Sequence, residues 1–128
     1  MAADGGSGAP SRRASNSELA GLFAEIAGYL ALEGESTYRI LAYEKAADLF
    51  RRHPLSIADL ALNGTLRELP GVGAAIEGKV LEFLSTGDMA FLARLRERYP
   101  AGLLEVMRVP GIGPKTARKL HDTIGIGS

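Results

Sequence analysis

Apolar side chains recur at helical spacing soon after the start of the chain. One predicted helix face is made by Leu19, Leu22, Phe23, Ile26 and Leu30. Residues three and four apart lie on the same side of an α-helix, so this spacing favours a helix with one buried face. Ser15 precedes the face and Glu18 lies three residues further on, which is the capping-box pattern of a helix start. Gly34 is the predicted stop.

A second helix is predicted to begin after Ser36. Its apolar face is made by Ile40, Tyr43, Ala47 and Phe50. It should end at His53, because a residue before proline avoids the α region and Pro54 follows. Residues 56–62 predict a short helix closed by Asn63 and Gly64, and 65–69 predict one further turn.

A later helix is expected to be capped by Asp88 and to end near Tyr99 and Pro100. No stretch alternates apolar and polar residues for long, so the sequence gives no evidence of a strand. The arginines at 94, 96 and 98 occupy every second position and cannot share one face, so most of them are expected to be solvated. The fold class predicted is all-α, a small helical bundle.

The chain contains an internal repeat. Residues 69–80 read LPGVGAAIEGKV, and residues 109–120, at an offset of 40, read VPGIGPKTARKL. Each copy predicts a short helix, a Pro-Gly-apolar-Gly hairpin and a longer helix. Two copies in register favour tandem helix-hairpin-helix motifs, whereas a single copy is only a tight turn between helices.

The hairpins offer a site for an anion. Their glycines can take positive φ and let a partner approach the backbone, while Val72 or Ile112 pins the two helices together. The first N–H groups of the following helix lack intrahelical partners and carry partial positive charge, so a phosphate fits there without any base contact. The predicted phosphate-binding residues are Gly71, Val72, Gly73, Ala75 and Lys79 in the first copy, and Gly111, Ile112, Gly113, Lys115, Thr116, Arg118 and Lys119 in the second.

Charge is distributed unevenly although the formal net charge is zero. Residues 1–88 carry 8 basic and 12 acidic side chains, and residues 89–128 carry 7 and 3. The basic excess therefore surrounds the second hairpin. On charge alone, this fits either a polyanionic partner there or random variation across a solvated surface. With no cysteine, disulfides and thiolate metal sites are excluded, and no apolar run is long enough for a membrane span. A cytoplasmic, nucleoid-associated protein is expected.

The chain from residue 22 to residue 126 resembles the N-terminal region of family X DNA polymerases, especially the bacterial PolX kind. The resemblance is carried by LFAEIAGYLALEGE from residue 22, TYRILAYEKAADLF at 37–50, LPGVG at 69–73, GKVLEFLSTGD at 78–88 and VPGIGPKTARKL at 109–120. It implies a bundle like the N-terminal domain of DNA polymerase beta, in which the first hairpin holds the downstream side of a DNA gap and the second holds the primer-side duplex.

The resemblance also implies an organisation and partners. We expect a disordered tail over 1–15, a lyase-like domain over 16–88 and a second hairpin subdomain over 89–128. The expected partner is gapped, nicked or duplex DNA during gap filling in base excision repair, with Arg39 as a further phosphate contact. No cofactor is expected except a Na⁺ or K⁺ ion at the hairpin carbonyls, namely those of Leu69, Val72, Val109 and Ile112.

The polymerase reaction itself is not expected from these residues. The family's palm, with its metal-binding aspartates, lies beyond this region, and aspartates such as Asp48, Asp59, Asp88 and Asp122 are scattered here. The chain is therefore expected to be truncated relative to a whole polymerase, whose remainder would be a further partner.

Two alternatives stay open. Some relatives excise a 5′-deoxyribose phosphate through a lysine Schiff base, and the resemblance places Lys79 at the nucleophile position. Ala75 and Asp88 stand where relatives carry positive charge, and Lys119 occupies the same position in a hairpin without a lyase role, so Lys79 is expected to face a phosphate. The other alternative is a helical protein-interaction domain.

Overall fold

The computed structural model describes residues 14–99 and 101–106. Every element in these ranges is helical, which confirms the all-α prediction. The elements in chain order are α2 (Asn16–Leu32), α3 (Thr37–Arg52), α4 (Ile57–Leu62), the 3₁₀ turn η1 (Leu66–Glu68), α5 (Ala74–Thr86), α6 (Ala90–Arg98) and α7 (Ala101–Val106).

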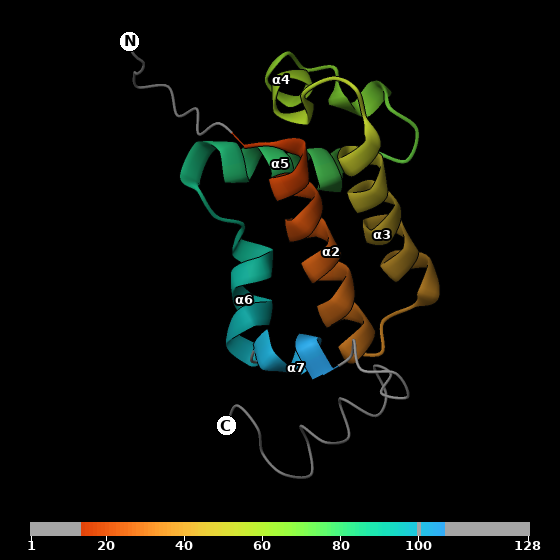
Figure 1. Ribbon diagram of the computed structural model, residues 1–128, viewed down its shortest axis with the longest axis vertical. Helices are drawn as coiled ribbons and strands as arrows, with labels where there is room; N and C mark the ends of the chain where they lie inside the picture. Colours follow the sequence, from red (N-terminus) through yellow and green to blue (C-terminus); the bar gives the residue numbers. More distant parts are fainter. Residues whose placement is uncertain (1–13, 100, 107–128) are drawn as a thin grey trace.

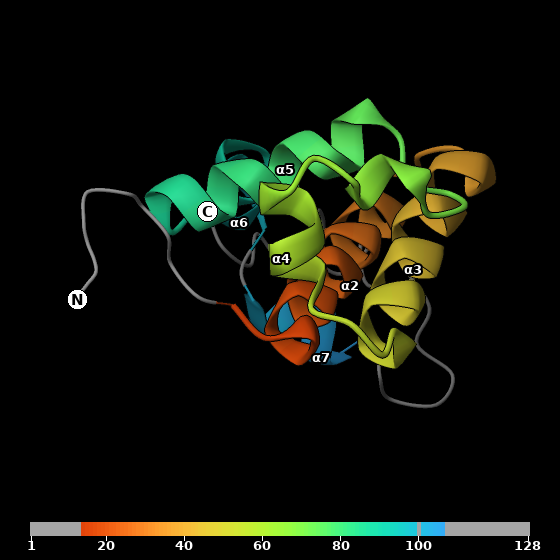
Figure 2. The same ribbon diagram turned by 90° about the horizontal axis from the view of Figure 1, so that it is seen from above.

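Helix α2 is the centre of the bundle. In Figure 1 it lies between α3 and α6, with α5 across one end and α7 at the other, and Figure 2 shows α4 beside α5 at the same end. Its inward residues include Leu19, Phe23, Ile26 and Leu30, none of which exposes more than 1% of its surface. The apolar face predicted from the sequence therefore forms the core.

Three serines cap the starts of three helices, and the caps at Ser15 and Ser36 are the predicted ones. The Ser15 hydroxyl accepts a hydrogen bond from the Glu18 N–H at 3.0 Å. Ser36 and Ser56 accept equivalent bonds, each at 3.2 Å, at the starts of α3 and α4. Each bond satisfies an N–H group that has no partner within its helix. The chain turns where predicted too, with Gly34 at a φ of 74° after α2 and His53 capping the end of α3.

The start of α6 differs from the prediction. The N-cap residue is Met89, not Asp88. The Asp88 carboxylate instead accepts a hydrogen bond from the Met89 N–H at 2.8 Å, and Glu82 accepts one from the Ala90 N–H at 2.8 Å. Met89 is fully buried, and anchoring its side chain in the core moves the helix start one residue beyond the acidic residue.

Asn16 joins two parts of the chain that are distant in sequence. Its Nδ2 group donates to the carbonyls of His53 and Leu55, at 3.2 and 2.9 Å. Its Oδ1 atom accepts from the Ile57 N–H at 2.8 Å. One side chain therefore fixes the connection between α3 and α4 against the first turn of α2.

Helices α6 and α7 pack on α2 through leucines. Leu92, Leu95 and Leu103 are buried in the common core, and Leu104 is packed against it. A Cβ atom built on Gly28 would lie 3.1 Å from Leu104 Cδ2, so α7 approaches α2 closely at a residue without a side chain.

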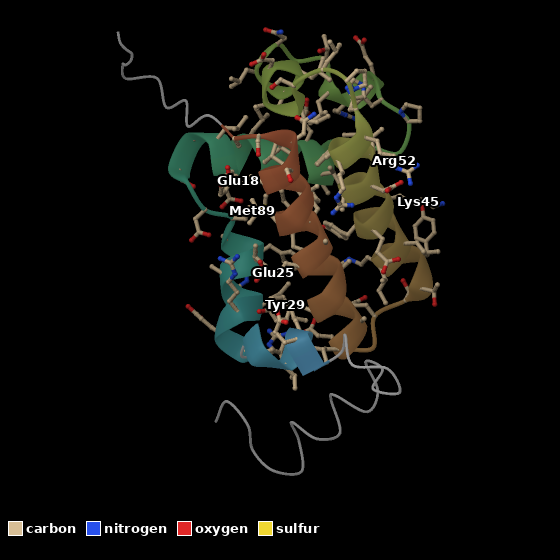
Figure 3. The ribbon with its side chains drawn as sticks, in the orientation of Figure 1. Glu18, Glu25, Tyr29, Lys45, Arg52 and Met89 are labelled. Carbon is tan, nitrogen blue, oxygen red and sulfur yellow. The ribbon has the colours of Figure 1, made fainter. Side chains whose placement is uncertain are left out.

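All three α6 arginines are exposed, as expected, but two of them also pair with acidic residues of α2 or its end. Arg96 forms a salt bridge with Glu25, and Arg98 forms one with Glu33. Figure 3 shows Glu25 and Tyr29 on the side of α2 that faces α6. The register of α6 on α2 turns both arginines toward acidic residues, and spacing along α6 alone does not reveal this.

The described residues cover only part of the predicted domain organisation. Ala14 is buried and Ser15 caps α2, so these two residues belong to the helical bundle and not to the predicted tail. Residues 1–13 lie outside the description, and the boundary at residue 88 stays a prediction. No described helix combines the length and the apolar character that crossing a bilayer requires.

Candidate functional site

The first predicted hairpin joins η1 to α5. The Val72 N–H donates a hydrogen bond to the Leu69 carbonyl at 3.2 Å, which closes the turn. Gly71 lies within that turn at a φ of 86°, a conformation that side chains with a Cβ rarely adopt. Val72 is 7% exposed and belongs to the core. The structure therefore confirms the expected division of roles, with glycine shaping the turn and the apolar residue anchoring it.

The N-terminus of α5 is open to a ligand. Its N-cap residue is Gly73, in extended backbone, and no side chain caps the first turn by a hydrogen bond. A Cβ atom added at Gly71, Gly73 or Gly78 would meet nothing within 4 Å, and Ala75 is exposed. The unpaired N–H groups of the first turn are thus accessible from outside, although Glu77 places a negative charge in the same turn.

A cluster of two cations and two aromatic rings lies one helical turn further along α5. The Lys79 Nζ atom is 4.9 Å from the centre of the Phe91 ring and 5.6 Å from that of Tyr43. The Arg39 guanidinium carbon is 5.6 Å from the Phe91 ring centre. These distances fall within the range of cation–π attraction. The cluster brings together α3, α5 and the first turn of α6.

The rings of the cluster continue into the core. Tyr43 stacks on Phe91 with ring centres 6.4 Å apart and on Phe23 with centres 5.9 Å apart. Tyr43 is 5% exposed and Phe23 is fully buried, so only Phe91, at the outer end, is half-buried. These stacked rings keep the Phe91 ring, against which both cations lie, in place.

Within the described residues, Lys79 has no carboxylate at ion-pair distance, whereas Arg39 pairs at 3.2 Å with Glu35, which lies just before α3. Among the described residues, ring faces are what hold the Lys79 ammonium, which can still form charge-assisted bonds with an incoming anion. The arrangement can bind an anion, and carboxylate or histidine clusters able to hold a metal ion are absent from the described part of the chain.

The structure groups some of the predicted residues and separates others. Arg39, Tyr43 and Lys79 come together, and Ala75 lies one turn before Lys79 on α5. Asp88 is engaged in the turn before α6. Lys45 is exposed and lies at the outer edge of α3 (Figure 3). The predicted residues of the second hairpin lie outside the described residues, namely Val109, Gly111, Ile112, Gly113, Lys115, Thr116, Arg118 and Lys119.

Phe91 was not anticipated from the sequence. It is the one aromatic side chain of α6, and a single phenylalanine at helical spacing is usually a core residue. Its place beside Lys79 and Arg39 depends on how α6 returns against α3 and α5. One sequence signal could have drawn attention to Phe91. It lies three residues after Asp88, in the segment that follows the first hairpin motif.

Comparison with known proteins agrees with this geometry. Residues 14–89 match a family described as a helix-hairpin-helix domain, and residues 103–128 match one described as a SAM-like helix-hairpin-helix tandem. The first match covers more than half of the chain, so this protein belongs to the helix-hairpin-helix domain family.

A curated relative points in the same direction. The chain is 27% identical over 105 residues to the DNA polymerase/3′-5′ exonuclease PolX of Bacillus subtilis (strain 168). The aligned part is 82% of this chain but only 18% of the relative. The resemblance to a helix-hairpin-helix region of a PolX-like protein is therefore confirmed, and this chain spans a small part of that relative's length.

Proposed function

We propose that this chain is a DNA-binding module that holds the sugar-phosphate backbone without reading the base sequence. The observation that carries the proposal is the uncapped N-terminus of α5, which opens at an exposed glycine hairpin on the same helix as Lys79. The Lys79 ammonium in turn shares the Phe91 ring with the Arg39 guanidinium. Backbone N–H groups and cationic side chains recognise phosphate, which is the same for every sequence.

The relative's name extends the proposal to DNA synthesis. A module of this kind would hold gapped or nicked DNA for the polymerase of a PolX-like protein during repair, in the cytoplasm and at the nucleoid. Both hairpins would contribute, the second with the basic side chains Lys115, Arg118 and Lys119. Basic residues near the second hairpin support a larger share of the affinity there.

A monovalent cation could complete the first hairpin. The Leu69 carbonyl already accepts a hydrogen bond from the Val72 N–H, but each carbonyl oxygen has a second lone pair. Carbonyl oxygens are suitable donors for a hard cation, so the carbonyls of Leu69 and Val72 fit Na⁺ or K⁺. Such an ion would add positive charge where a phosphate approaches.

A salt titration tests the main proposal. The binding of this chain to a labelled duplex is measured between low and moderate salt, with several unrelated sequences and with 5′-phosphorylated gapped DNA. We expect similar affinities across sequences and a slope of about −2 to −5 in log K against log salt, because a few counterions are released. Absence of binding at low salt would favour the protein-interaction alternative, and a strong preference for one sequence would contradict the proposal.

Two glycine variants measure how much each hairpin contributes to duplex binding. Gly113→Val is expected to weaken duplex binding more than Gly73→Val, because the basic residues lie with the second hairpin. A β-branched side chain would block close approach of a phosphate at either position. Thermal melts of both variants must accompany the titrations, and equal losses in two well-folded variants would show that the charge asymmetry is irrelevant.

Lyase activity is the second candidate, since Lys79 lies with Arg39 and Tyr43 in one cluster. Removing a 5′-deoxyribose phosphate would require Lys79 to attack the sugar aldehyde as a neutral amine. Ala75 supplies no charge to hold the 5′ phosphate, and Asp88 is engaged by the turn before α6. DNA binding without this chemistry is therefore the function that we favour.

A further inference from the structure

We infer that Phe91 is a positioning residue of the DNA-binding site, whose ring holds the Lys79 ammonium and the Arg39 guanidinium side by side so that one phosphate contacts both. This inference rests on the proposed function and deepens it, because it assigns the spacing of the two cations to a third residue on another helix.

Phe91 is the shared partner of the two cations. Its ring centre is 4.9 Å from Lys79 Nζ and 5.6 Å from the Arg39 guanidinium carbon, whereas Tyr43 has such a contact with Lys79. Arg39 and Lys79 lie on different helices, α3 and α5. A ring from a third helix, α6, therefore joins them.

The contact works against the tendency of the two side chains to separate. Two positive charges repel each other, and lysine and arginine side chains sample many rotamers when nothing holds them. The negative face of an aromatic ring attracts both cations. Ordering them before DNA arrives removes part of the entropic cost of binding, which is the general advantage of preorganisation.

The ring itself is firmly placed. Phe91 follows the buried Met89 and precedes the buried Leu92 in the first turn of α6. Its inner neighbour is Tyr43, which is backed by Phe23. The ring can therefore fix the two flexible side chains without being displaced by them.

The test compares Phe91→Leu, which keeps an apolar side chain but removes the ring, with the conservative control Phe91→Tyr. We expect Phe91→Leu to weaken binding to 5′-phosphorylated gapped DNA about three- to tenfold at low salt, and Phe91→Tyr to bind like the parent. In a background that carries Arg39→Gln and Lys79→Gln, Phe91→Leu should cause no further loss. An equal loss in that background would show a merely structural role and overturn the inference.

A spectroscopic readout tests the geometry in the free protein. Protons of the Lys79 side chain that lie over a ring face are shifted upfield in NMR spectra, and this shift should be present in the parent and largely lost in Phe91→Leu. An unshifted Lys79 in the parent would overturn the inference whatever the variants do. Thermal melts check folding, and Phe91→Met, which is apolar and flexible, serves as a second variant if Phe91→Leu does not fold.

The outcomes separate the two proposals. A parent chain that binds no DNA at low salt would overturn the proposed function and this inference together. A parent that binds, with Phe91→Leu folded and equally tight, would overturn the inference alone and leave the proposed function standing.

Discussion

Arg96 on α6 donates two hydrogen bonds to Glu25 on α2, one from Nε at 2.7 Å and one from Nη2 at 2.6 Å. The hydrogen bonds that the Arg96 guanidinium donates to Glu25 are the largest of the effects that raise its pKa above the ordinary value. A planar guanidinium matches a carboxylate in this two-point geometry, which lysine cannot reproduce. The pair therefore fixes both the distance and the rotation of α6 on α2.

Breaking this pair should cost a measurable amount of stability. Arg96 exposes 48% of its side chain and Glu25 exposes 21%, so solvent screening limits the coupling free energy to about 0.5–1 kcal/mol. A double-mutant cycle with Glu25→Gln and Arg96→Gln, followed by urea unfolding, measures it. The matched control is the Asp48 and Arg52 pair within α3, which is 51% and 77% exposed and should show almost no coupling. Equal coupling in both pairs would contradict this view.

Tyr29 should make the stability of the protein sensitive to alkaline pH. Burial raises the pKa of its phenol, and the nearby Glu25 carboxylate adds to the effect. Because the neutral phenol is favoured in the folded state, its contribution is complete below the ordinary tyrosine pKa of about 10 and is lost as the pH rises above it. Tyr29→Phe should therefore flatten the fall in unfolding free energy above about pH 10.

The same variant should be tolerated at neutral pH. The Tyr29 hydroxyl is buried, and no acceptor among the described residues meets it at full hydrogen-bond geometry; the Glu25 carboxylate is close enough only to contribute a hydrogen bond to its raised pKa. A buried hydroxyl without a well-formed hydrogen bond costs about 1 kcal/mol or more. Tyr29→Phe is thus expected to be as stable as the parent or up to about 1 kcal/mol more stable at pH 7. Tyr38→Phe, at a residue that is 86% exposed, is the control. A clear loss of stability at pH 7 in Tyr29→Phe would show that the hydroxyl has a partner.

The two hairpin glycines should respond differently to alanine. A Cβ atom has open space at both Gly71 and Gly73, but only Gly71 has a positive φ, of 86°. Gly71→Ala should lower the unfolding free energy by about 1 kcal/mol through backbone strain. Gly73→Ala should leave stability nearly unchanged while weakening DNA binding, because its methyl group stands where a phosphate would approach. Thermal melts and salt titrations on both variants check the contrast, and the reverse order of stability would refute it.

Lys79 should form little or no covalent adduct with an abasic substrate. Borohydride trapping on gapped DNA that carries a 5′-deoxyribose phosphate measures this, with Lys79→Ala as the comparison. A robust adduct in the parent that disappears in Lys79→Ala would establish a lyase. A faint adduct that persists in Lys79→Ala would point to exposed lysines such as Lys45.

Features that depend on local sequence could be predicted. Ser15, Ser36 and Ser56 cap helices because a serine hydroxyl reaches the N–H three residues ahead, whatever the rest of the chain does. Gly71 and Val72 take their expected places because the hairpin motif itself requires a free backbone and an anchor.

Features that depend on the return of α6 could not be predicted. The α6 helix meets α2 and α3 from positions about 50 to 70 residues away in sequence, and its register decides which side chains meet. Arg96 therefore pairs with Glu25, and Phe91 faces Lys79 and Arg39. The periodicity of apolar residues in the sequence predicts neither contact. The start of α6 was misplaced for the same reason, since burial of Met89 prevails over the capping preference of Asp88.

The three hydrogen bonds of Asn16 have a consequence for how the protein opens. Helix α4 has only six residues, and a helix of that length has little stability of its own. Because Asn16 binds the Ile57 N–H at the start of α4 and the two carbonyls before it, α4 cannot detach while the first turn of α2 stays folded around that side chain. The Ile57 amide should therefore exchange its hydrogen at the same rate as the central helix, so that a peripheral segment belongs to the slowest-opening cooperative unit of the molecule.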